Sequence, residues 1–254
     1  MIIGSMIIGG CFSSKTHKFK STSIFGKEIK LTGNLLKPEG DGPFPAIVLL
    51  HRCGGIKQWD YDWAHTLNKW GYVAFVVDSL GPRYKSQNCE SFTNPNRGDI
   101  AMDAHSAKFY LAGLSFVDSN KIAIMGWSFG ASATLTAIGN DYTKFLPVEK
   151  KEPFKAAIAF YPYCNDLMSD FNAPLLILIG DKDDWTPAEL CSGRMPQEKT
   201  THEVKLKIYE NTYHCFDCRG RSTTNNMGHV LRYNSNTTSD SMIMTKQFLE
   251  KYLR

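Results

Sequence analysis

The sequence predicts an α/β fold with a mostly parallel central sheet, flanked by helices and without a separate lid domain. Between Ala46 and Tyr209, short apolar runs alternate with amphipathic stretches, which is typical of βαβ units. A G-x-S-x-G pentapeptide, Gly126–Gly130, stands between such a run and a helix-like stretch. The 254 residues, 43% hydrophobic and 21% charged, suit a globular core. We expect residues 1–17 to form an N-terminal tail or the remnant of a lipoprotein-like signal, and residues 18–254 to form a single domain.

The first half of the chain predicts two edge strands, a buried strand and a long helix. The segment Lys18–Lys37 has the pattern of antiparallel edge strands. The aliphatic run Pro45–Leu50 is typical of a strand buried on both faces, and it ends in the turn His51–Gly55. The segment Arg97–Leu114 predicts a helix that precedes the strand leading to the serine motif.

The second half predicts three more strands and two helices. Ile122–Met125 is an apolar run before the serine, and residues 131–137 after it favour a helix. The run Pro174–Gly180 suits a buried parallel strand, whereas Val204–Tyr209 alternates apolar and polar residues, as a strand with one wet face does. Thr245–Leu253 predicts the closing helix.

The serine motif indicates a nucleophile. A serine on a tight strand-to-helix turn has its hydroxyl displaced out of the sheet, and glycines on either side allow the backbone to make that turn. The helix that follows Ser128 offers free N–H groups and the positive end of its dipole where an oxyanion would form. The alternative is a turn of small residues with a capping serine, because G-x-S-x-G also occurs by chance.

An acid and a histidine each follow a predicted strand downstream of Ser128. Three acids, Asp181, Asp183 and Asp184, follow the run that ends at Gly180, and His214 follows the strand that ends at Tyr209. The order serine, acid, histidine is that of hydrolases built on such sheets. A histidine can take the serine proton near neutral pH, and the acid orients the imidazole. Taken singly, the histidine could be an ordinary loop residue and the acids helix caps or solvated charges.

A glycine pair after the first buried strand suggests a second functional turn. In His51–Gly55 the two glycines allow backbone N–H groups to approach a ligand closely. We assign the oxyanion contacts to the backbone N–H groups of Cys53 and of Phe129, the residue after the nucleophile. A plain strand-to-helix turn is the alternative for this segment.

Together these residues resemble the dienelactone hydrolase family of the α/β-hydrolase superfamily. The likeness runs from about Gly26 to the C-terminus and includes these segments: Gly42–Ala46, His51–Gly55, Gly71–Ala74, Val77–Arg83, Met125–Ser128, Phe160–Pro162, Gly180–Pro187 and Tyr213–Asp217. The resemblance implies an α/β-hydrolase fold and a cofactor-free serine or cysteine hydrolase that acts on small esters or lactones.

The resemblance also selects among the acids. In this family the catalytic aspartate often lies four residues before a proline, as Asp183 does before Pro187. We therefore expect Asp183 to orient His214, with Asp184 as the second choice and Asp181 as a cap of the loop.

Two departures from the family bear on the substrate. The best-known members use a cysteine nucleophile, whereas this chain has Ser128, which favours ordinary ester hydrolysis. Arg52 stands where those members have glutamate, so it could recognise an acidic substrate or pair with a surface carboxylate. Some members hold a substrate carboxylate with an arginine placed like Arg83, which could instead pair with an acid such as Glu90. We add Trp127 and Trp185, beside the motif residues, as candidate substrate-binding residues.

Charge and composition limit the partners. A net charge of +4 without a lysine or arginine run gives no indication of nucleic-acid binding. The sequence implies no metal and no cofactor, and it leaves the oligomeric state open. The lone C-x-x-C at Cys215–Cys218 is a weak candidate for a zinc or redox site, because no second ligand pair is spaced to complete it.

The N-terminus and the cysteines leave the compartment open. Residues 7–11 resemble a bacterial lipobox that ends at Cys11, a possible site of lipid anchoring, but no basic residue precedes Cys11. Export and a cytoplasmic location are therefore both possible. Removal of Cys11 leaves six cysteines, an even number that permits disulfides, and Cys89 and Cys191 are expected at one edge, where they could meet.

The sequence thus favours a serine hydrolase that cleaves small carboxylic esters or lactones through an acyl-enzyme. Its expected site is Ser128, His214 and Asp183, with Cys53 and Phe129 at the oxyanion. A peptidase of the same superfamily is the alternative among enzymes. A non-catalytic ligand-binding protein on the hydrolase fold is the alternative outside them.

Overall fold

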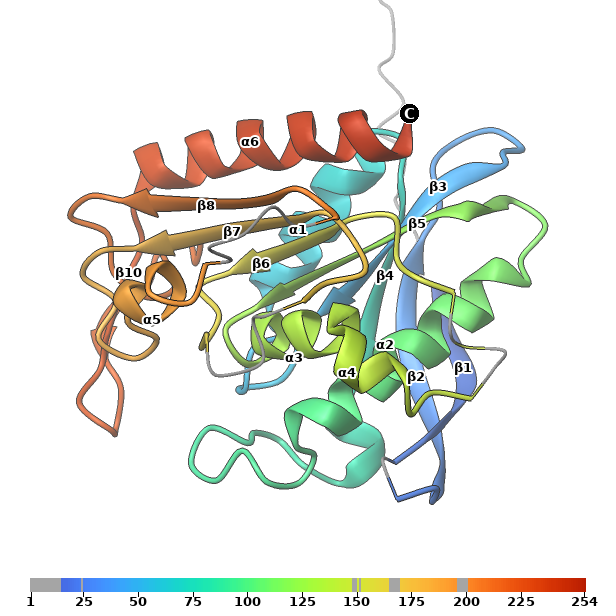
Figure 1. Ribbon diagram of the computed structural model, residues 1–254, viewed down its shortest axis with the longest axis horizontal. Coiled ribbons are helices and arrows are strands. Elements are labelled where there is room, and N and C mark those ends of the chain that lie inside the picture. The colour runs from blue at the N-terminus through green and yellow to red at the C-terminus, as the bar shows by residue number, and fades with distance from the viewer. Residues whose placement is uncertain (1–14, 24, 148–149, 151, 165–169, 196–200) are drawn as a thin grey trace, which may run out of the picture.

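An eight-stranded sheet forms the centre of the protein (Figure 1). The computed structural model describes residues 15–23, 25–147, 150, 152–164, 170–195 and 201–254. The strands lie in the order β1-β2-β4-β3-β5-β6-β7-β8. Their bounds are β1 (Lys15–Thr22), β2 (Glu28–Leu36), β3 (Phe44–Leu50), β4 (Val73–Asp78), β5 (Val117–Trp127), β6 (Ala157–Phe160), β7 (Leu175–Gly180) and β8 (Val204–Tyr209).

Strands β4, β3, β5, β6, β7 and β8 pair in parallel, and β1 and β2 form an antiparallel hairpin at one edge. The predicted fold class is therefore confirmed, and so is the predicted edge pair. Because the carboxyl ends of parallel strands meet at one edge of a sheet, the loops after β3, β5, β6, β7 and β8 lie close together.

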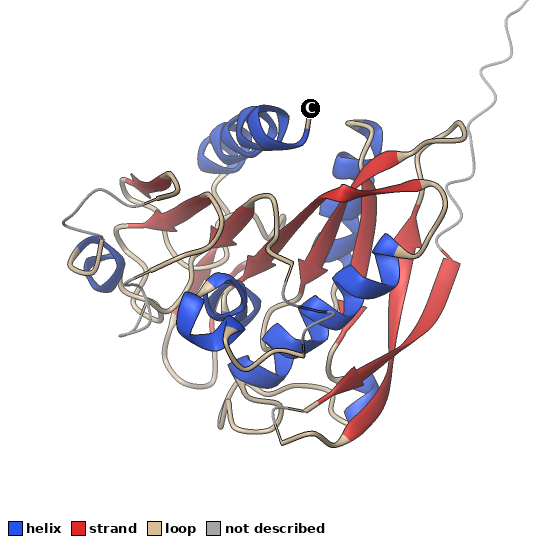
Figure 2. Ribbon diagram, turned by 45° about the vertical axis from the view of Figure 1, so that its right-hand side comes forward, coloured by secondary structure: helices blue, strands red, loops and turns tan. Residues whose placement is uncertain are grey.

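Helices cover both faces of the sheet (Figures 1 and 2). Helices α2 and α3 lie on one face, and α1 and α6 lie on the other. The bounds are α1 (Gln58–Lys69), the 3₁₀ turn η1 (Gly81–Arg83), α2 (Arg97–Ala112), α3 (Phe129–Ile138), α4 (Asn140–Thr143), α5 (Ala188–Ser192) and α6 (Ser235–Leu253). None of the helices in the described ranges is long and apolar enough to cross a membrane.

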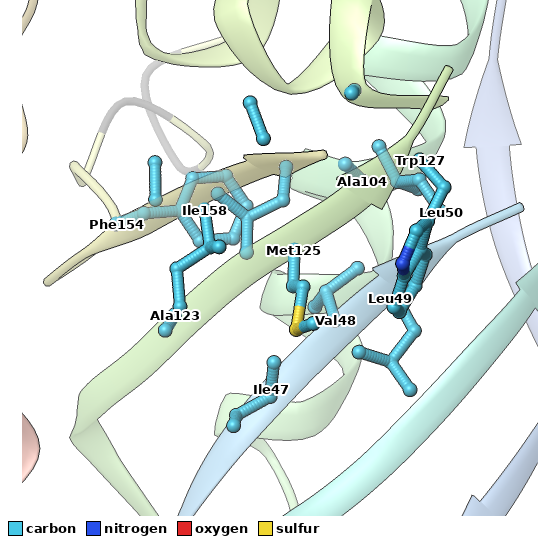
Figure 3. Close-up of a cluster of buried hydrophobic side chains, with 14 of the residues drawn as sticks. Ile47, Val48, Leu49, Leu50, Ala104, Ala123, Met125, Trp127, Phe154 and Ile158 are labelled. Carbon is cyan, nitrogen blue, oxygen red and sulfur yellow. The ribbon is translucent and has the colours of Figure 1, made fainter. Parts of the chain in front are cut away.

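The core consists of the aliphatic strands and the helix faces packed on them. Figure 3 shows Leu49, Met125 and Ile158 side by side on the neighbouring strands β3, β5 and β6, and all three are fully buried. These strands are apolar on both faces because helices cover both faces, which is the usual arrangement of a parallel sheet.

The closing helix is longer than expected. Helix α6 begins at Ser235, ten residues before the predicted start at Thr245. The Asn234 side chain caps it by accepting hydrogen bonds from the backbone N–H groups of Asn236 and Thr237. The first turns are rich in serine and threonine, which are weak helix formers, so the sequence alone did not indicate a helix there. A short hairpin, β9 (Ser222–Thr224) and β10 (Val230–Arg232), precedes it.

Six cysteines form three disulfides: Cys53–Cys89, Cys164–Cys191 and Cys215–Cys218. The expected approach of Cys89 to Cys191 is wrong, because each has another partner. Cys89 joins the loop after β4 to the turn after β3, and Cys191 joins α5 to the loop after β6. The C-x-x-C pair does not supply metal ligands in this form, because zinc binds thiolates and these two sulfurs are bonded to each other. Cys11 lies outside the described residues.

Disulfides form and persist in oxidising compartments, so the pairing can be tested in the native cell. Trapping free thiols in intact native cells with a membrane-permeant alkylating reagent should leave these six cysteines unmodified in the mass spectrum. The same treatment after reduction should modify all six. Alkylation of the six before reduction would contradict the pairing.

Candidate active site

Ser128 occupies a sharp turn between β5 and α3. Its backbone has φ 52° and ψ −117°, a left-handed φ that a residue with a side chain rarely adopts. The flanking glycines are required by close contacts: a Cβ on Gly126 would lie 2.3 Å from the carbonyl oxygen of Gly130, and one on Gly130 would lie 2.3 Å from that of Leu50. The turn therefore packs directly against the end of β3 and presents the serine hydroxyl at the sheet edge.

Ser128, His214 and Asp183 form a continuous hydrogen-bonded chain. The Nε2 atom of His214 lies 2.9 Å from the Ser128 Oγ, and its Nδ1 lies 2.7 Å from the Asp183 Oδ2. All three residues are buried. They come from the loops after β5, β7 and β8, which the parallel sheet brings to one edge. The arrangement permits the imidazole to take the hydroxyl proton while the carboxylate fixes the tautomer.

The loop after β7 holds the Asp183 carboxylate in place. Its Oδ1 accepts hydrogen bonds from the backbone N–H groups of Trp185 and Thr186, at 3.0 and 2.8 Å. The Thr186 hydroxyl lies 2.8 Å from Asp183 Oδ2 and 3.2 Å from His214 Nδ1. Thr186 is not among the site residues predicted from the sequence. Its position in the sequence could have indicated this role, because a hydroxyl three residues after an aspartate can donate a hydrogen bond to that carboxylate.

The other two acids of this loop have different partners. Asp181 Oδ1 accepts from the backbone N–H of Thr212 at 3.2 Å, which ties the loop after β7 to the loop that carries His214. Asp184 Oδ1 accepts from the backbone N–H of Val230 at 3.2 Å, and its side chain is 48% exposed. Asp183 is thus the acid of this loop that contacts His214.

The candidate oxyanion turn follows β3. Residues 52–55 form a turn in which the Gly55 N–H donates to the Arg52 carbonyl at 3.1 Å. Within such a turn the N–H of the second residue, here Cys53, takes no part in the closing hydrogen bond. Phe129 is the first residue of α3, so its N–H is one of those without an acceptor inside the helix. The Cys53–Cys89 disulfide anchors the turn from the side of the β4 loop.

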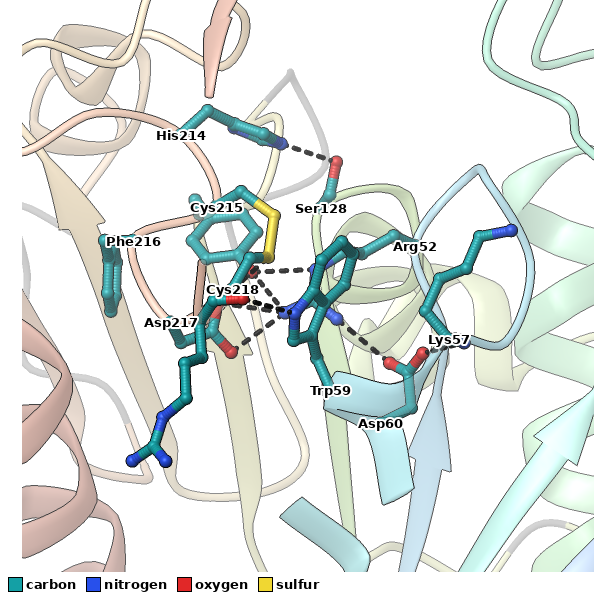
Figure 4. Close-up of a disulfide and its surroundings, with 12 residues drawn as sticks. Arg52, Lys57, Trp59, Asp60, Ser128, His214, Cys215, Phe216, Asp217 and Cys218 are labelled. Carbon is teal, nitrogen blue, oxygen red and sulfur yellow. Dashed lines mark hydrogen bonds and ion pairs between the residues drawn. A yellow bond between two sulfur atoms is a disulfide. The ribbon is translucent and has the colours of Figure 1, made fainter. Parts of the chain in front are cut away.

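A buried ionic cluster lies beside the triad (Figure 4). The guanidinium of Arg52 contacts Asp217 at 2.8 and 2.9 Å, Asp60 at 3.0 Å and the hydroxyl of Tyr161 at 2.6 and 2.9 Å. Asp217 also accepts from the Trp63 indole N–H at 2.8 Å and from the Tyr161 hydroxyl. We call Arg52, Asp60, Trp63, Tyr161 and Asp217 the arginine cluster.

The arginine cluster corrects the expectation that Arg52 binds an acidic substrate. The residue is only 7% exposed, and its donors are directed to two carboxylates and a phenol. Burial alone would lower the pKa of Arg52, but the charges of Asp217 and Asp60 outweigh it and raise that pKa. Arg52 therefore stays protonated as an internal counter-ion. The predicted partners were a substrate carboxylate or a surface carboxylate. The partners in the structure are the buried carboxylates of Asp60 and Asp217.

The structure also corrects the prediction that Arg83 and Trp127 bind substrate. The Arg83 guanidinium binds the buried Asp103 through two hydrogen bonds of 2.7 and 3.0 Å, so its partner is neither a substrate nor Glu90. Trp127 is fully buried and packs against Trp63 and Phe160, at ring centroid distances of 5.9 and 5.7 Å. The fourth candidate, Trp185, does line the cavity beside Ser128.

His214 is held by aromatic rings as well as by hydrogen bonds. The ring centroids of Tyr161 and Trp185 lie 4.6 and 5.0 Å from that of the imidazole. The His214 carbonyl accepts from the backbone N–H of Arg232 at 3.0 Å, which joins the histidine loop to β10. Burial raises the pKa of Tyr161 well above its ordinary value, so this phenol remains neutral and can donate to Asp217.

The fold and the hydroxyl–imidazole–carboxylate chain are those of an α/β-hydrolase. The family model described as "Dienelactone hydrolase family" matches residues 31–253. The chain belongs to the dienelactone hydrolase family.

Curated relatives and solved structures are similar to the chain over most of its length. It is 25% identical over 202 residues to a Bradyrhizobium sp protein assigned as a 2-oxo-3-(5-oxofuran-2-ylidene)propanoate lactonase, covering 72% of this chain and 77% of that protein. It is 26% identical over 220 residues to a Yersinia pestis protein assigned as a carboxymethylenebutenolidase, covering 81% and 82%. Of the dipeptidyl peptidases that it also matches, the chain covers 16% or less. A dienelactone hydrolase structure from Klebsiella pneumoniae shares the fold, with a TM-score of 0.72 at 18% identity over 94% of this chain and 100% of that one.

Replacement of Arg52 tests the arginine cluster. Arg52→Met would leave Asp60 and Asp217 buried without a counter-charge, and the free energy of unfolding should fall by about 3–5 kcal/mol, as measured by urea denaturation. The control is Lys144→Met, which breaks the exposed pair with Asp141 and should leave the denaturation midpoint unchanged. Equal effects of the two substitutions would contradict a structural role of the cluster.

Proposed function

We propose that the protein hydrolyses small carboxylic esters or lactones through an acyl-enzyme formed on Ser128. The observation that carries the proposal is the hydrogen-bonded chain from Ser128 through His214 to Asp183, which opens on a cavity lined in part by Ser128 itself. Membership of the dienelactone hydrolase family supports the same chemistry, as do relatives assigned as a lactonase and a carboxymethylenebutenolidase.

The geometry supports a two-step route. In the first step the Ser128 Oγ attacks the carbonyl carbon while His214 Nε2 takes the hydroxyl proton. The tetrahedral intermediate then expels the alcohol, or opens the lactone ring, as His214 returns the proton to the leaving oxygen. In the second step a water molecule, deprotonated by His214, attacks the acyl-enzyme and releases the acid. Asp183 stabilises the imidazolium in both steps.

Two backbone N–H groups are proposed to hold the oxyanion. Phe129 provides one at the start of α3, where the helix dipole also favours negative charge. Cys53 provides the other, from the turn that directly follows Leu50 and His51, whose carbonyl oxygens Gly130 approaches closely. Because the Cys53–Cys89 disulfide and the neighbouring Arg52 fix this turn from two sides, the donor is held in position before substrate binds.

The alternatives are less well supported. A peptidase of the same superfamily is favoured only by matches that cover 16% or less of the dipeptidyl peptidases concerned. A non-catalytic binding protein would have no need of the 2.7 and 2.9 Å contacts that join the carboxylate, imidazole and hydroxyl.

Loss of the nucleophile tests the acyl-enzyme directly. Ser128→Ala should lower kcat for p-nitrophenyl acetate on the order of 10³-fold or more, because only the oxyanion contacts and binding would remain. It should also abolish covalent labelling by a fluorophosphonate probe. Ser132→Ala is the control, since Ser132 lines the same cavity but its hydroxyl donates to the Ser128 carbonyl; this variant should retain labelling. Labelling of the Ser128→Ala variant would contradict the assignment of Ser128 as the nucleophile.

A second pair of variants separates the acids. Asp183→Asn should lower kcat by about 10³–10⁴-fold, because an amide can stabilise the wrong imidazole tautomer and carries no charge. Asp184→Asn should stay within about tenfold of the wild type, since this half-exposed side chain contacts the Val230 N–H and the His229 imidazole. The measurement is steady-state kinetics with p-nitrophenyl acetate. A greater loss at Asp184 would show that the histidine is oriented by the other acid.

A further inference from the structure

A cavity of about 880 Å³ adjoins Ser128. This volume lies in the upper part of the range found for sites that take drug-sized ligands, and it exceeds what an acetyl group or a small lactone needs. The walls come from α2 and the loop before it, from α3, from α4 and the residues after it, and from the loops after β6 and β7. The cavity is therefore part of the proposed hydrolase site but extends well beyond its reacting atoms.

Apolar side chains dominate the walls. Aromatic rings line the cavity on several sides, and methionine and leucine side chains add to them: the residues are Phe92, Met102, Phe129, Tyr142, Phe145, Leu146, Tyr163 and Trp185. Phe92 and Phe129 pack together, with ring centroids 5.1 Å apart, and Trp185 is stacked on His229 at 5.2 Å. Phe92 and Phe129 thus hold each other within the wall, and Trp185 is held by His229, which does not line the cavity. These three rings present preformed apolar surfaces.

Three hydroxyl groups in the walls, those of Ser132, Thr136 and Tyr142, donate to backbone carbonyls. Ser132 Oγ lies 3.2 Å from the Ser128 carbonyl and accepts from the backbone N–H of Tyr163. The Thr136 hydroxyl donates to the Ser132 carbonyl, and the Tyr142 hydroxyl donates to the Gly98 carbonyl at 2.6 Å. Their hydrogens are therefore not directed to a ligand, so these residues add little polar recognition to the walls.

Charge is nearly absent from the cavity. Among the described residues that line it, Arg97 is the only one that carries a formal charge. The two arginines that sequence analysis offered for an anionic substrate, Arg52 and Arg83, are held by buried aspartates. A carboxylate in this cavity would lose its hydration among mainly apolar walls, which is costly unless a cation replaces the water.

From these observations we propose that the preferred substrate is a neutral ester with a bulky aromatic group, which the cavity takes up on the acyl or the alcohol side of the reacting carbonyl. The inference rests on the proposed function, because Ser128 must be the nucleophile. Offset and edge-to-face contacts with the fixed rings would orient such a group, and its burial would supply most of the binding.

Three neutral esters provide the test: methyl acetate, methyl 3-phenylpropanoate and 3-phenylpropyl acetate, with acid release followed by pH-stat. At least one of the two aromatic esters should exceed methyl acetate in kcat/KM by about tenfold or more, the factor that about 1.4 kcal/mol of extra binding gives. If both aromatic esters stay within about threefold of methyl acetate, the proposal is overturned.

A charged analogue tests the neutrality of the substrate. The better aromatic ester is compared with the same ester carrying a carboxylate on the para position of its ring. The charged ester should be worse in kcat/KM by about tenfold or more, because its carboxylate loses water in an apolar site. A higher kcat/KM for the charged ester than for the neutral one would overturn the proposal. Loss of that difference in Arg97→Gln would then indicate an anionic substrate bound by Arg97.

Two exposed phenylalanines provide matched variants. Phe145 is 84% exposed and lies at the cavity, whereas Phe25 is 86% exposed and lies outside it. Phe145→Ala should lower the ratio of kcat/KM for the better aromatic ester to that for methyl acetate by about fivefold. Phe25→Ala should leave this ratio at the wild-type value. Equal ratios in the two variants would remove Phe145 from the binding surface and contradict the proposed cavity.

Failure of this inference differs from failure of the proposed function. If the wild type hydrolyses none of the three esters and is not labelled at Ser128 by a fluorophosphonate, the proposed function itself fails. If Ser128 is labelled and kcat/KM for methyl acetate equals that for the aromatic esters, only the proposed substrate class is wrong.

Discussion

The buried ion pair between Arg52 and Asp217 is the interaction on which the arrangement of the site depends. Arg52 is the first residue of the candidate oxyanion turn after β3, and Asp217 lies three residues after His214. Through Asp60 and Tyr161 the same guanidinium also reaches α1 and the end of β6. A buried charge without partners would cost several kcal/mol, so each loop is held to the position that satisfies it. The pair therefore gives specificity of geometry more than net stability: it fixes the distance between the turn that carries Cys53 and the loop that carries His214.

That constraint explains how strained backbone persists at the site. Ser128, Tyr161 and Cys215 all have a left-handed φ, at 52°, 42° and 61°, and each such residue costs on the order of 1–3 kcal/mol. Ser128 is the proposed nucleophile, Tyr161 packs on the His214 ring, and Cys215 directly follows His214. Tyr161 belongs to the arginine cluster and Cys215 to the Cys215–Cys218 disulfide, and Figure 4 shows Arg52, Asp217 and this disulfide near Ser128 and His214. The strained residues thus lie where other interactions compensate for the conformational cost. These are the hydrogen bonds of the arginine cluster, the Cys215–Cys218 disulfide and the tight packing at Gly126 and Gly130.

The same constraint shapes what the site can recognise. An arginine beside an oxyanion turn could serve a substrate carboxylate only if its charge were available, and here two aspartates neutralise it. Arg83 is neutralised in the same way by Asp103. The proposed substrate recognition therefore rests on the cavity formed by α2, α3, α4 and the loops after β6 and β7, whose walls are mostly aromatic and aliphatic. In the proposed function, catalytic geometry and substrate selection would therefore depend on different groups of residues: the arginine cluster beside the Ser128–His214–Asp183 chain, and the apolar cavity.

The sequence by itself determined the fold class, the edge hairpin, the family and the three residues Ser128, Asp183 and His214 that the structure joins. These features are local: apolar periodicity reports burial, and a motif at a strand end reports a side chain at the sheet edge. The early start of α6 was hidden because its capping residue Asn234 precedes weak helix formers. The partners of Arg52, Arg83 and the cysteines were decided only by tertiary structure. Arg52 and Asp217 are 165 residues apart in the chain, and a charge or a thiol carries no local signal of its partner. An arginine has the same sequence signature whether it faces a ligand or a buried aspartate, because the difference lies in which surfaces the packed helices cover.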